Sequence, residues 1–180
     1  LVISTLSGAG NVRADGGALE VGGGGGRIAV YYVDLSTFDR ARIHVLGGQG
    51  GNAIAGNGSV FLKSVTEGNG TLVFDGQSAS SPYSTLPIPP GFVFDNIVIR
   101  NHARAVIDQP ILVNDRLQVL DDSVLTHPTA QESGLSITAR SVYVDATSRI
   151  DLTGKGYLGG RQPGNDSYNE GRTLGNQIGA

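Results

Sequence analysis

The residues best suited to chemistry lie near the middle of the chain, where carboxylates and arginines occur together. The carboxylates are Asp108, Asp121 and Asp122, and the arginines are Arg104 and Arg116. Glycoside cleavage uses a pair of carboxylates, and β-elimination uses carboxylates with Ca²⁺ and a basic residue. The same residue types also fill the solvent-facing positions of ordinary strands. The group is therefore a candidate catalytic set whose support is analogy with β folds that degrade polysaccharides.

Turns rich in aspartate supply the oxygen ligands that Ca²⁺ prefers. Asp15 lies in one such turn, and Asp121 and Asp122 are adjacent in another. Neither turn has the ligand spacing of an EF-hand loop or of a GGxGxD repeat. Aspartate is also common in turns because its side chain hydrogen-bonds the nearby backbone. The sequence therefore predicts no cofactor, with calcium as the alternative.

Other motifs that carry chemistry are incomplete in this chain. Residues 154–159 match the G-x-G-x-x-G fingerprint of dinucleotide binding, but Pro163 and Gly164 follow where the fingerprint needs a helix. The histidines at 44, 102 and 127 lack metal-ligand spacing. No cysteine is present, so disulfides, thiolate metal sites and cysteine nucleophiles are excluded.

Three asparagines begin the N-x-[ST] pattern of N-glycosylation acceptors: Asn57, Asn69 and Asn165. All three lie in turns that the sequence predicts to be at the surface. The pattern also arises by chance in a chain rich in asparagine, serine and threonine. These positions are candidates for modification and carry no functional argument by themselves.

Length and charge narrow the class of protein. A chain of 180 residues, 39% of them hydrophobic, can form one ordinary domain with a core. The 13 basic and 16 acidic residues are interleaved, so there is no basic stripe to bind nucleic acid. No apolar run reaches the about 18 residues of a membrane span. The sequence therefore predicts neither a nucleic-acid partner nor a membrane span.

The composition also indicates where the protein resides. A cysteine-free chain rich in Gly, Asn, Ser and Thr is typical of bacterial surface and secreted proteins, which favours an extracellular or cell-surface location. The chain begins at Leu1 and shows no signal peptide. We interpret it as a mature fragment or an excised piece of a longer protein.

Short runs with apolar residues at alternate positions recur along the chain and predict strands with one buried face. They cover residues 28–32, 42–46, 59–63, 71–75, 96–100, 104–108, 116–120, 123–126, 135–138, 141–144 and 149–152. No window has helical spacing over ten or more residues, and at most one helical turn is expected within 33–40. The sequence therefore predicts an all-β protein.

A repeated plan favours one all-β architecture over the others. Residues 42–51 and 149–157 share an Arg-Ile strand followed by a glycine turn, and residues 11–17 are a weaker copy. Strand-then-glycine units that stack on one another form a solenoid. We expect a right-handed parallel β-helix, or β-solenoid, with a β-sandwich as the alternative.

Glycine and proline divide the chain into parts. The 28 glycines cluster near the two ends, and a run such as 22–26 indicates chain that turns or passes close to another segment. A Pro/Ser-rich loop at 78–91 interrupts the glycine-poor middle, and a Gly/Asn-rich tail covers 159–180. We interpret 1–180 as a single β-solenoid-like domain or a segment of a longer repeat array.

The strings at 22–32 (GGGGGRIAVYY) and 148–157 (SRIDLTGKGY) carry a resemblance. Together they resemble the glycine-rich repeat modules of very large bacterial surface or adhesin-like proteins, which are expected to form parallel β-helices. In that family the two strings follow each other, whereas here they lie at opposite ends. The resemblance implies a segment cut from, or permuted relative to, a repeating array.

The resemblance implies a structural or adhesive module of a large secreted or cell-surface protein, assembling end to end into an array or filament. Its partners would be copies of itself, neighbouring modules of the same protein, or glycans. The alternative is a carbohydrate-binding or polysaccharide-degrading β-helix domain. A groove with converging carboxylates would distinguish this alternative from the structural module.

Overall fold

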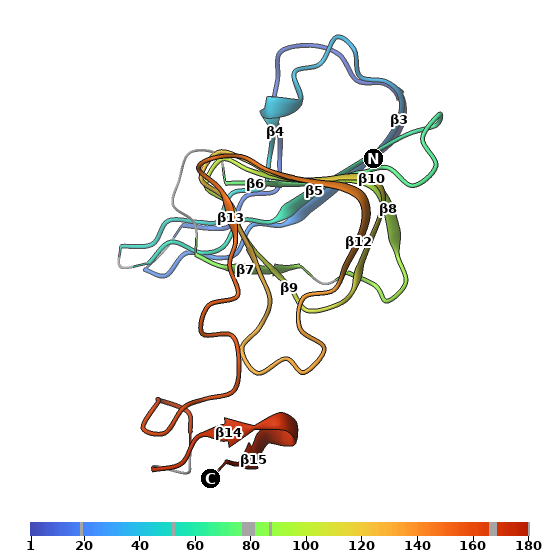
Figure 1. The fold of residues 1–180 in the computed structure, drawn as a ribbon. Coiled ribbons are helices and arrows are strands. Elements are labelled where there is room, and N and C mark those ends of the chain that lie inside the picture. Colours follow the sequence, from blue (N-terminus) through green and yellow to red (C-terminus); the bar gives the residue numbers. More distant parts are fainter. Residues whose placement is uncertain (19, 52, 77–81, 87, 166–168, 180) are drawn as a thin grey trace.

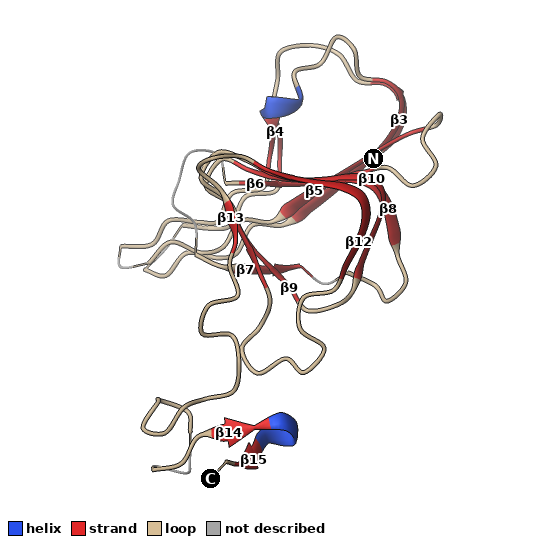
Figure 2. Ribbon diagram, viewed as in Figure 1, coloured by secondary structure: helices blue, strands red, loops and turns tan. Residues whose placement is uncertain are grey.

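The computed structural model describes residues 1–18, 20–51, 53–76, 82–86, 88–165 and 169–179. Within these residues the backbone consists of strands and turns (Figure 2), and the helical part is limited to two single 3₁₀ turns, η1 (Arg40–Arg42) and η2 (Leu174–Asn176). The all-β prediction is confirmed. None of the described helical segments is long or apolar enough to cross a membrane.

Two sheets contain most of the strands (Figure 1). The seven-stranded sheet has the order β1 (Val2–Thr5), β3 (Arg27–Asp34), β5 (Ser59–Ser64), β6 (Thr71–Asp75), β8 (Val93–Arg100), β10 (Ile111–Val119), β12 (Ile137–Val144). The four-stranded sheet contains β7 (Ser84–Leu86), β9 (Arg104–Ile107), β11 (Val124–Thr126) and β13 (Arg149–Ile150). Two small pairs are formed by β2 (Val12–Arg13) with β4 (Ile43–His44), and by β14 (Arg172–Thr173) with β15 (Gln177–Ile178).

Consecutive strands from β8 to β13 alternate between the two large sheets. β10 pairs in parallel with both β8 and β12, and β11 pairs in parallel with both β9 and β13. Each passage of the chain therefore adds one strand to each sheet, directly beside the strand of the previous passage, and we call one such passage a coil. Parallel strands need such crossover connections, and here the second sheet is part of the crossover.

The large sheet contains one reversal that the strand pattern did not predict. β5 and β6 pair antiparallel, with Val60 opposite Val73 and Phe61 opposite Leu72, whereas all other neighbours in this sheet are parallel. The connecting turn ends at Gly70, whose φ is +82°. The sheet is therefore mixed, and a uniformly parallel arrangement over the whole chain is not present.

The reversal separates two lobes whose cores lie on opposite faces of the sheet. Residues opposite one another in a pair point to the same face, so Val60 and Val73 face one core while Phe61 and Leu72 face the other. In Figure 1 β4 lies on one side of the sheet, and β7 and β9 lie on the other. We call residues 1–65 the N-terminal lobe and residues 71–152 the C-terminal lobe.

A constant hand of turn accounts for the change of face. Crossovers between parallel strands keep one hand. After β5 the strands run in the opposite direction, but new strands are still added on the same side of the sheet. Crossovers that keep the same handedness must then pass over the opposite face of the sheet. The antiparallel pair therefore determines where both cores form.

The C-terminal core contains columns of mainly aliphatic side chains that run from strand to strand, and we call them the aliphatic columns. One column is Leu72, Ile97, Leu117 and Val142, and a second is Phe74, Ile99, Val119 and Val144. Leu125 continues the packing in the second sheet, between Ala105 and Ile150. Each rung is covered by the next, so an interior strand buries its whole inward face.

The N-terminal lobe combines a smaller core with close backbone packing. Its core contains Val30, Tyr32, Leu35, Phe38, Ile43, Val45, Val60 and Leu62. Beside this core, glycine segments are linked by backbone hydrogen bonds, from Gly23 N to Gly17 O (2.9 Å) and from Gly48 N to Gly23 O (2.8 Å). A Cβ atom at Gly16, Gly25 or Gly48 would collide with a neighbouring carbonyl. The prediction that glycines 22–26 pass close to other chain is confirmed.

The predicted loop and tail contain short strands of their own. Within 78–91, β7 pairs with β9, while residues 78–81 and 87 lie outside the described residues. Within the tail, β14 and β15 form an antiparallel pair around η2. Gly175 N of η2 donates to Glu132 Oε1 (2.9 Å), which also accepts from the Tyr157 hydroxyl (2.9 Å). This contact ties the tail to the C-terminal lobe.

We expect Gly16→Ala to lower the free energy of unfolding by about 1–3 kcal/mol, because the added methyl meets the Gly23 carbonyl oxygen. Gly17→Ala is the matched control, since a Cβ there meets nothing within 4 Å. We expect the control to stay within about 0.5 kcal/mol of the parent. Urea unfolding of the three proteins measures the difference, and equal effects of the two substitutions would contradict the close packing.

Candidate functional site

The predicted carboxylates Asp121 and Asp122 form a corner between β10 and β11. Both have positive φ, 58° and 55°, and the corner of the preceding coil, at Asn101 and His102, has the same form with φ of 55° and 63°. Aspartate and asparagine tolerate this conformation better than most residues. The Asp122 carboxylate lies 3.1 Å from His102 Nδ1. Both aspartates therefore have a conformational role in stacking the coils.

Side chains of the last coil satisfy the backbone of this corner. Asp145 Oδ2 accepts from Asp121 N (2.7 Å), Thr147 Oγ1 from Asp122 N (3.0 Å), and Ser148 Oγ from Ser123 N (3.1 Å). The bond from the Asp121 N–H is the main cause that holds the pKa of Asp145 well below its usual range, with further bonds from Ser148 and Thr147. Asp145, Thr147 and Ser148 were not among the residues singled out from the sequence, although aspartate, threonine and serine in a turn are typical of side chains that hydrogen-bond the backbone.

Among the other members of the candidate catalytic set, Arg104 is near this corner because it pairs with Val124, whereas Asp108 and Arg116 lie farther along their strands. Asp108 directly follows the last residue of β9, whereas Arg104 is the first residue of that strand. The buried Oδ1 of Asp108 has no hydrogen-bond partner among the described residues. The Cζ atom of Arg104 lies 5.8 Å from the centre of the Tyr83 ring. Arg116 on β10 donates to Ser141 Oγ on β12 at 3.4 Å. No carboxylate pair with an adjacent arginine is assembled from these residues.

The calcium candidates are held by protein groups. Asp15 forms an ion pair with Arg13 at 2.6 Å and accepts from Leu46 N at 2.8 Å. Burial opposes the ionisation of Asp15, but the bonds from Leu46 and Arg13 outweigh it and lower its pKa. Across the described part of the chain, no three His, Asp or Glu side chains are grouped as metal ligands would be.

The side-chain amides of the three candidate glycosylation sites all take part in hydrogen bonds. Asn57 Nδ2 donates to Asp75 O (3.0 Å), and Asn69 Nδ2 lies 3.4 Å from Asp95 Oδ1. Asn165 Nδ2 donates to Glu170 O (2.7 Å), while Ser167 of its acceptor pattern lies outside the described residues. In the folded chain these amides hold neighbouring segments together.

Asp95 ties the reversal of the large sheet to the coil behind it. From β8, its carboxylate accepts from Asn69 N (2.7 Å) and Gly70 N (3.0 Å) in the β5–β6 turn. Asn114 Nδ2 on β10 donates to the same carboxylate (3.0 Å). The bond from Asn69 N is the main cause that lowers the pKa of Asp95, although burial opposes it. The charged carboxylate thus connects the turn, β8 and β10.

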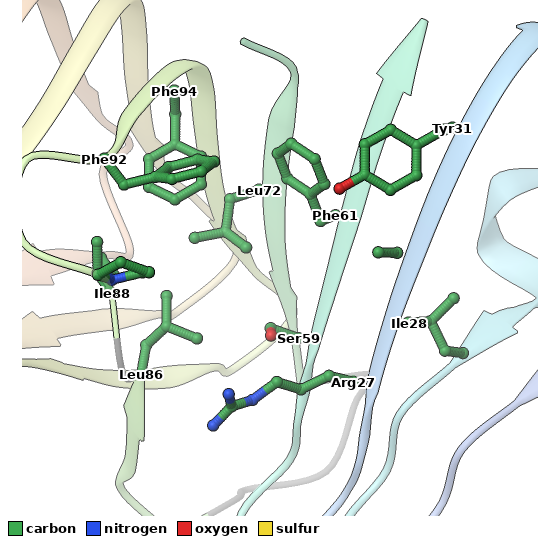
Figure 3. A pocket seen from close by; sticks show the side chains of 12 residues that line it. Arg27, Ile28, Tyr31, Ser59, Phe61, Leu72, Leu86, Ile88, Phe92 and Phe94 are labelled. Carbon is green, nitrogen blue, oxygen red and sulfur yellow. The ribbon is translucent and has the colours of Figure 1, made fainter. Parts of the chain in front are cut away.

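An aromatic groove lies at the end of the C-terminal core, next to β3 and β5 (Figure 3). It has a volume of about 250 Å³, and its lining includes Tyr31, Phe61, Phe92, Phe94, Leu86 and Arg27. The Phe61 ring lies 5.9 Å from Tyr31 and 6.1 Å from both Phe92 and Phe94. Among the described residues of this lining, Arg27 is the one that carries a charge. The groove therefore combines aromatic walls with a cation.

The aromatic groove was not predicted from the sequence. Alternation in the strand puts Tyr31 and Tyr32 on opposite faces, and Tyr32 is buried while Tyr31 is exposed. The groove needs β3, β5 and the segment before β8 side by side. Only the reversal brings these elements together, and no local pattern indicates it.

A second candidate surface is the open coil end, formed by Val142, Tyr143 and Val144 of β12 with Ile150 of β13. The aliphatic columns stop here: Leu117 and Val119 are 0% exposed, whereas Val142 is 47% and Val144 36% exposed. β12 and β13 are the edge strands of their sheets. The inward face of a coil is thus left without the next rung.

We expect Asp95→Asn to destabilise the protein at neutral pH, by about 1 kcal/mol, because a charge-assisted acceptor is lost. The folded-state pKa of Asp95 is lowered, so its stabilisation is present above the unfolded pKa of about 3.9 and is lost as the pH falls through the folded pKa. The difference between parent and variant should therefore shrink below about pH 3. Urea unfolding at both pH values tests this, with Asp115→Asn on exposed β10 surface as control. A difference independent of pH would contradict the assignment.

The function of this chain is inferred from its own geometry, because the comparisons with known proteins found no match. No family model, no curated protein and no solved structure matches the chain. The surfaces that follow from the fold are the open coil end and the aromatic groove.

Proposed function

We propose that this chain is a structural or adhesive module of a large secreted or cell-surface protein. Its coils are right-handed β-solenoid coils, the hand that crossovers between parallel strands adopt in nearly all proteins. Its partners are copies of itself or neighbouring modules, joined end to end in an array. The observation that carries the proposal is the open coil end.

Two properties of the open coil end favour a further coil as its partner. Val142 and Val144 occupy the positions that Leu117 and Val119 fill in the coil before, so an added strand would continue the same aliphatic columns. The outer backbone edge of β12 is unpaired among the described residues, and unpaired edges favour pairing with another strand. A coil placed here satisfies both the side chains and the backbone.

The energy available at this surface suits association between modules. Fully burying a valine or isoleucine side chain contributes roughly 1.5–3 kcal/mol. Val142, Val144 and Ile150 are each between a third and a half exposed, so covering the remainder contributes about 1 kcal/mol apiece. Backbone pairing along β12 adds to this, and the sum supports reversible contacts that many copies together make strong.

We expect the protein to self-associate as its concentration rises and Val142→Lys to shift this association by at least about ten-fold. A lysine there places a charge in the column that the next coil would cover. Sedimentation velocity over a concentration series measures the shift. Val65→Lys is the matched control, because Val65 is 69% exposed but lies in the turn after β5. A parent protein that stays monomeric at all concentrations would overturn the proposal.

A second candidate function is carbohydrate binding, which the aromatic groove favours. Ligand sites are concave and largely apolar, with a few polar groups that fix orientation. In Figure 3 the aromatic rings line the groove above Arg27 and Ser59, which are able to hydrogen-bond hydroxyls or a carboxylate of a sugar. This arrangement suits one or two sugar rings that carry an acidic group.

We expect oligosaccharides that contain uronic acid to bind more tightly than neutral ones, because the cation Arg27 lines the groove. Phe92→Ala should weaken binding by about ten-fold, since it removes a wall of the groove. Calorimetric titration measures both effects, with Tyr83→Ala as an exposed aromatic control outside the groove. Absence of binding by every oligosaccharide, or equal effects of the two variants, would argue against this function.

A further inference from the structure

The C-terminal end of β12 contains a palindromic segment. Its exposed large apolar residues are Val142, Tyr143 and Val144, and this three-residue segment reads the same in both directions. Val142 and Val144 face the core, and Tyr143, which is 53% exposed, faces the other side of the sheet. A palindromic edge can pair with itself in the antiparallel direction without changing which side chains meet.

The backbone of β12 is oriented for such a pair. Asp145 N donates to Val119 O on β10 at 3.1 Å. Because N–H groups alternate in direction along a strand, the N–H of Tyr143 also points to β10, and those of Val142 and Val144 point to the free edge. In an antiparallel pair centred on Tyr143, that residue is a non-hydrogen-bonded position and its neighbours exchange hydrogen bonds. Donors and acceptors thus match on both strands.

We propose that two copies of this chain pair through β12 about a two-fold axis at Tyr143. Val142 then lies opposite Val144 of the partner subunit, and Tyr143 lies opposite Tyr143 of the partner subunit. An axis perpendicular to the sheet keeps the two C-terminal cores on the same face, so the aliphatic columns run from one copy into the other. This rests on the proposed function, because it assumes that the open coil end is an association surface. A two-fold contact is closed, so this surface joins copies in pairs, and the array of the proposed function would be built from such pairs.

A centre of symmetry at Val142 fits less well. Centring the pair on Val142 would place Tyr143 opposite Ser141 of the partner subunit and Val144 opposite Arg140 of the partner subunit. Centring it on Tyr143 instead places Ser141 opposite Asp145 of the partner subunit, a polar pair without like charges. The apolar side chains then meet only one another.

Pairing with the other edge of the sheet is also less favourable. The free strand there is β1, whose Val2 is 86% exposed, but the core of the N-terminal lobe lies on the opposite face. A β12–β1 contact would cover the open coil end with one strand and no second sheet. The two-fold pair brings a complete coil, with Ile150 of each copy near the contact. Viewed as in Figure 1, the described part of the tail lies below the coils and does not overlie β12.

Cysteine cross-linking tests the two-fold pair, since the chain has no cysteine of its own. Opposite Cα atoms at a non-hydrogen-bonded position are ~4.5 Å apart, within the ~4.4–6.8 Å span of disulfides. We expect Tyr143→Cys to form a disulfide-linked dimer at least about ten-fold faster than Leu174→Cys, whose residue is exposed in the tail. Copies with Val142→Cys should link to copies with Val144→Cys faster than to themselves.

The failure of this pairing can be told apart from the failure of the proposed function. If the parent self-associates in sedimentation but Tyr143→Cys links no faster than Leu174→Cys, the two-fold pair is wrong and the proposed function stands. Preferential linking of Val2→Cys copies to Val142→Cys copies would likewise overturn the pair and show head-to-tail contact. If the parent does not self-associate, the proposed function fails together with the pair.

Discussion

The antiparallel pair between β5 and β6 is the contact on which both lobes depend. It turns the strand direction within one continuous sheet, and with it the face over which the chain passes. The Asp95 carboxylate holds the turn against β8 and β10 through four donors, two of them backbone N–H groups. The aromatic groove is a direct consequence, because β3 and β5 continue the sheet past the end of the C-terminal core.

Successive coils pack on one another differently in the two lobes. The C-terminal lobe stacks aliphatic side chains in columns, and its corners are aligned by hydrogen bonds such as the one from Asp121 N to Asp145 Oδ2. The N-terminal lobe replaces part of its core by glycine segments that lie backbone against backbone. Both kinds of packing repeat from coil to coil, and a repeat that stops leaves an unsatisfied surface. That surface is the open coil end.

Local patterns in the sequence predicted most of the longer strands, but they did not predict β1, β7, β14 or β15, nor how the strands pair. Alternation over 96–100 and 116–120 predicted β8 and β10, and the strand-glycine copies at 11–17 and 42–51 do lie together as β2 and β4. The reversal was not predictable, because an alternating strand looks the same in parallel and antiparallel neighbours. Val142 and Val144 were likewise read as core residues by their alternation, and their exposure depends on a neighbour that the pattern does not contain. Asp121 and Asp122 looked like ligands because corner residues and metal ligands share the same side chains.

We propose that the free edge of β12, at the end of the C-terminal lobe, receives another strand. Amide hydrogen exchange of β12 at low and high protein concentration tests it most directly, because neighbouring amides of one strand point to different partners. We expect the amides of Val142 and Val144 to become protected as the concentration rises, while the amide of Tyr143, which points to β10, keeps the same protection. Exchange at Val142 and Val144 that is fast and independent of concentration would contradict the account.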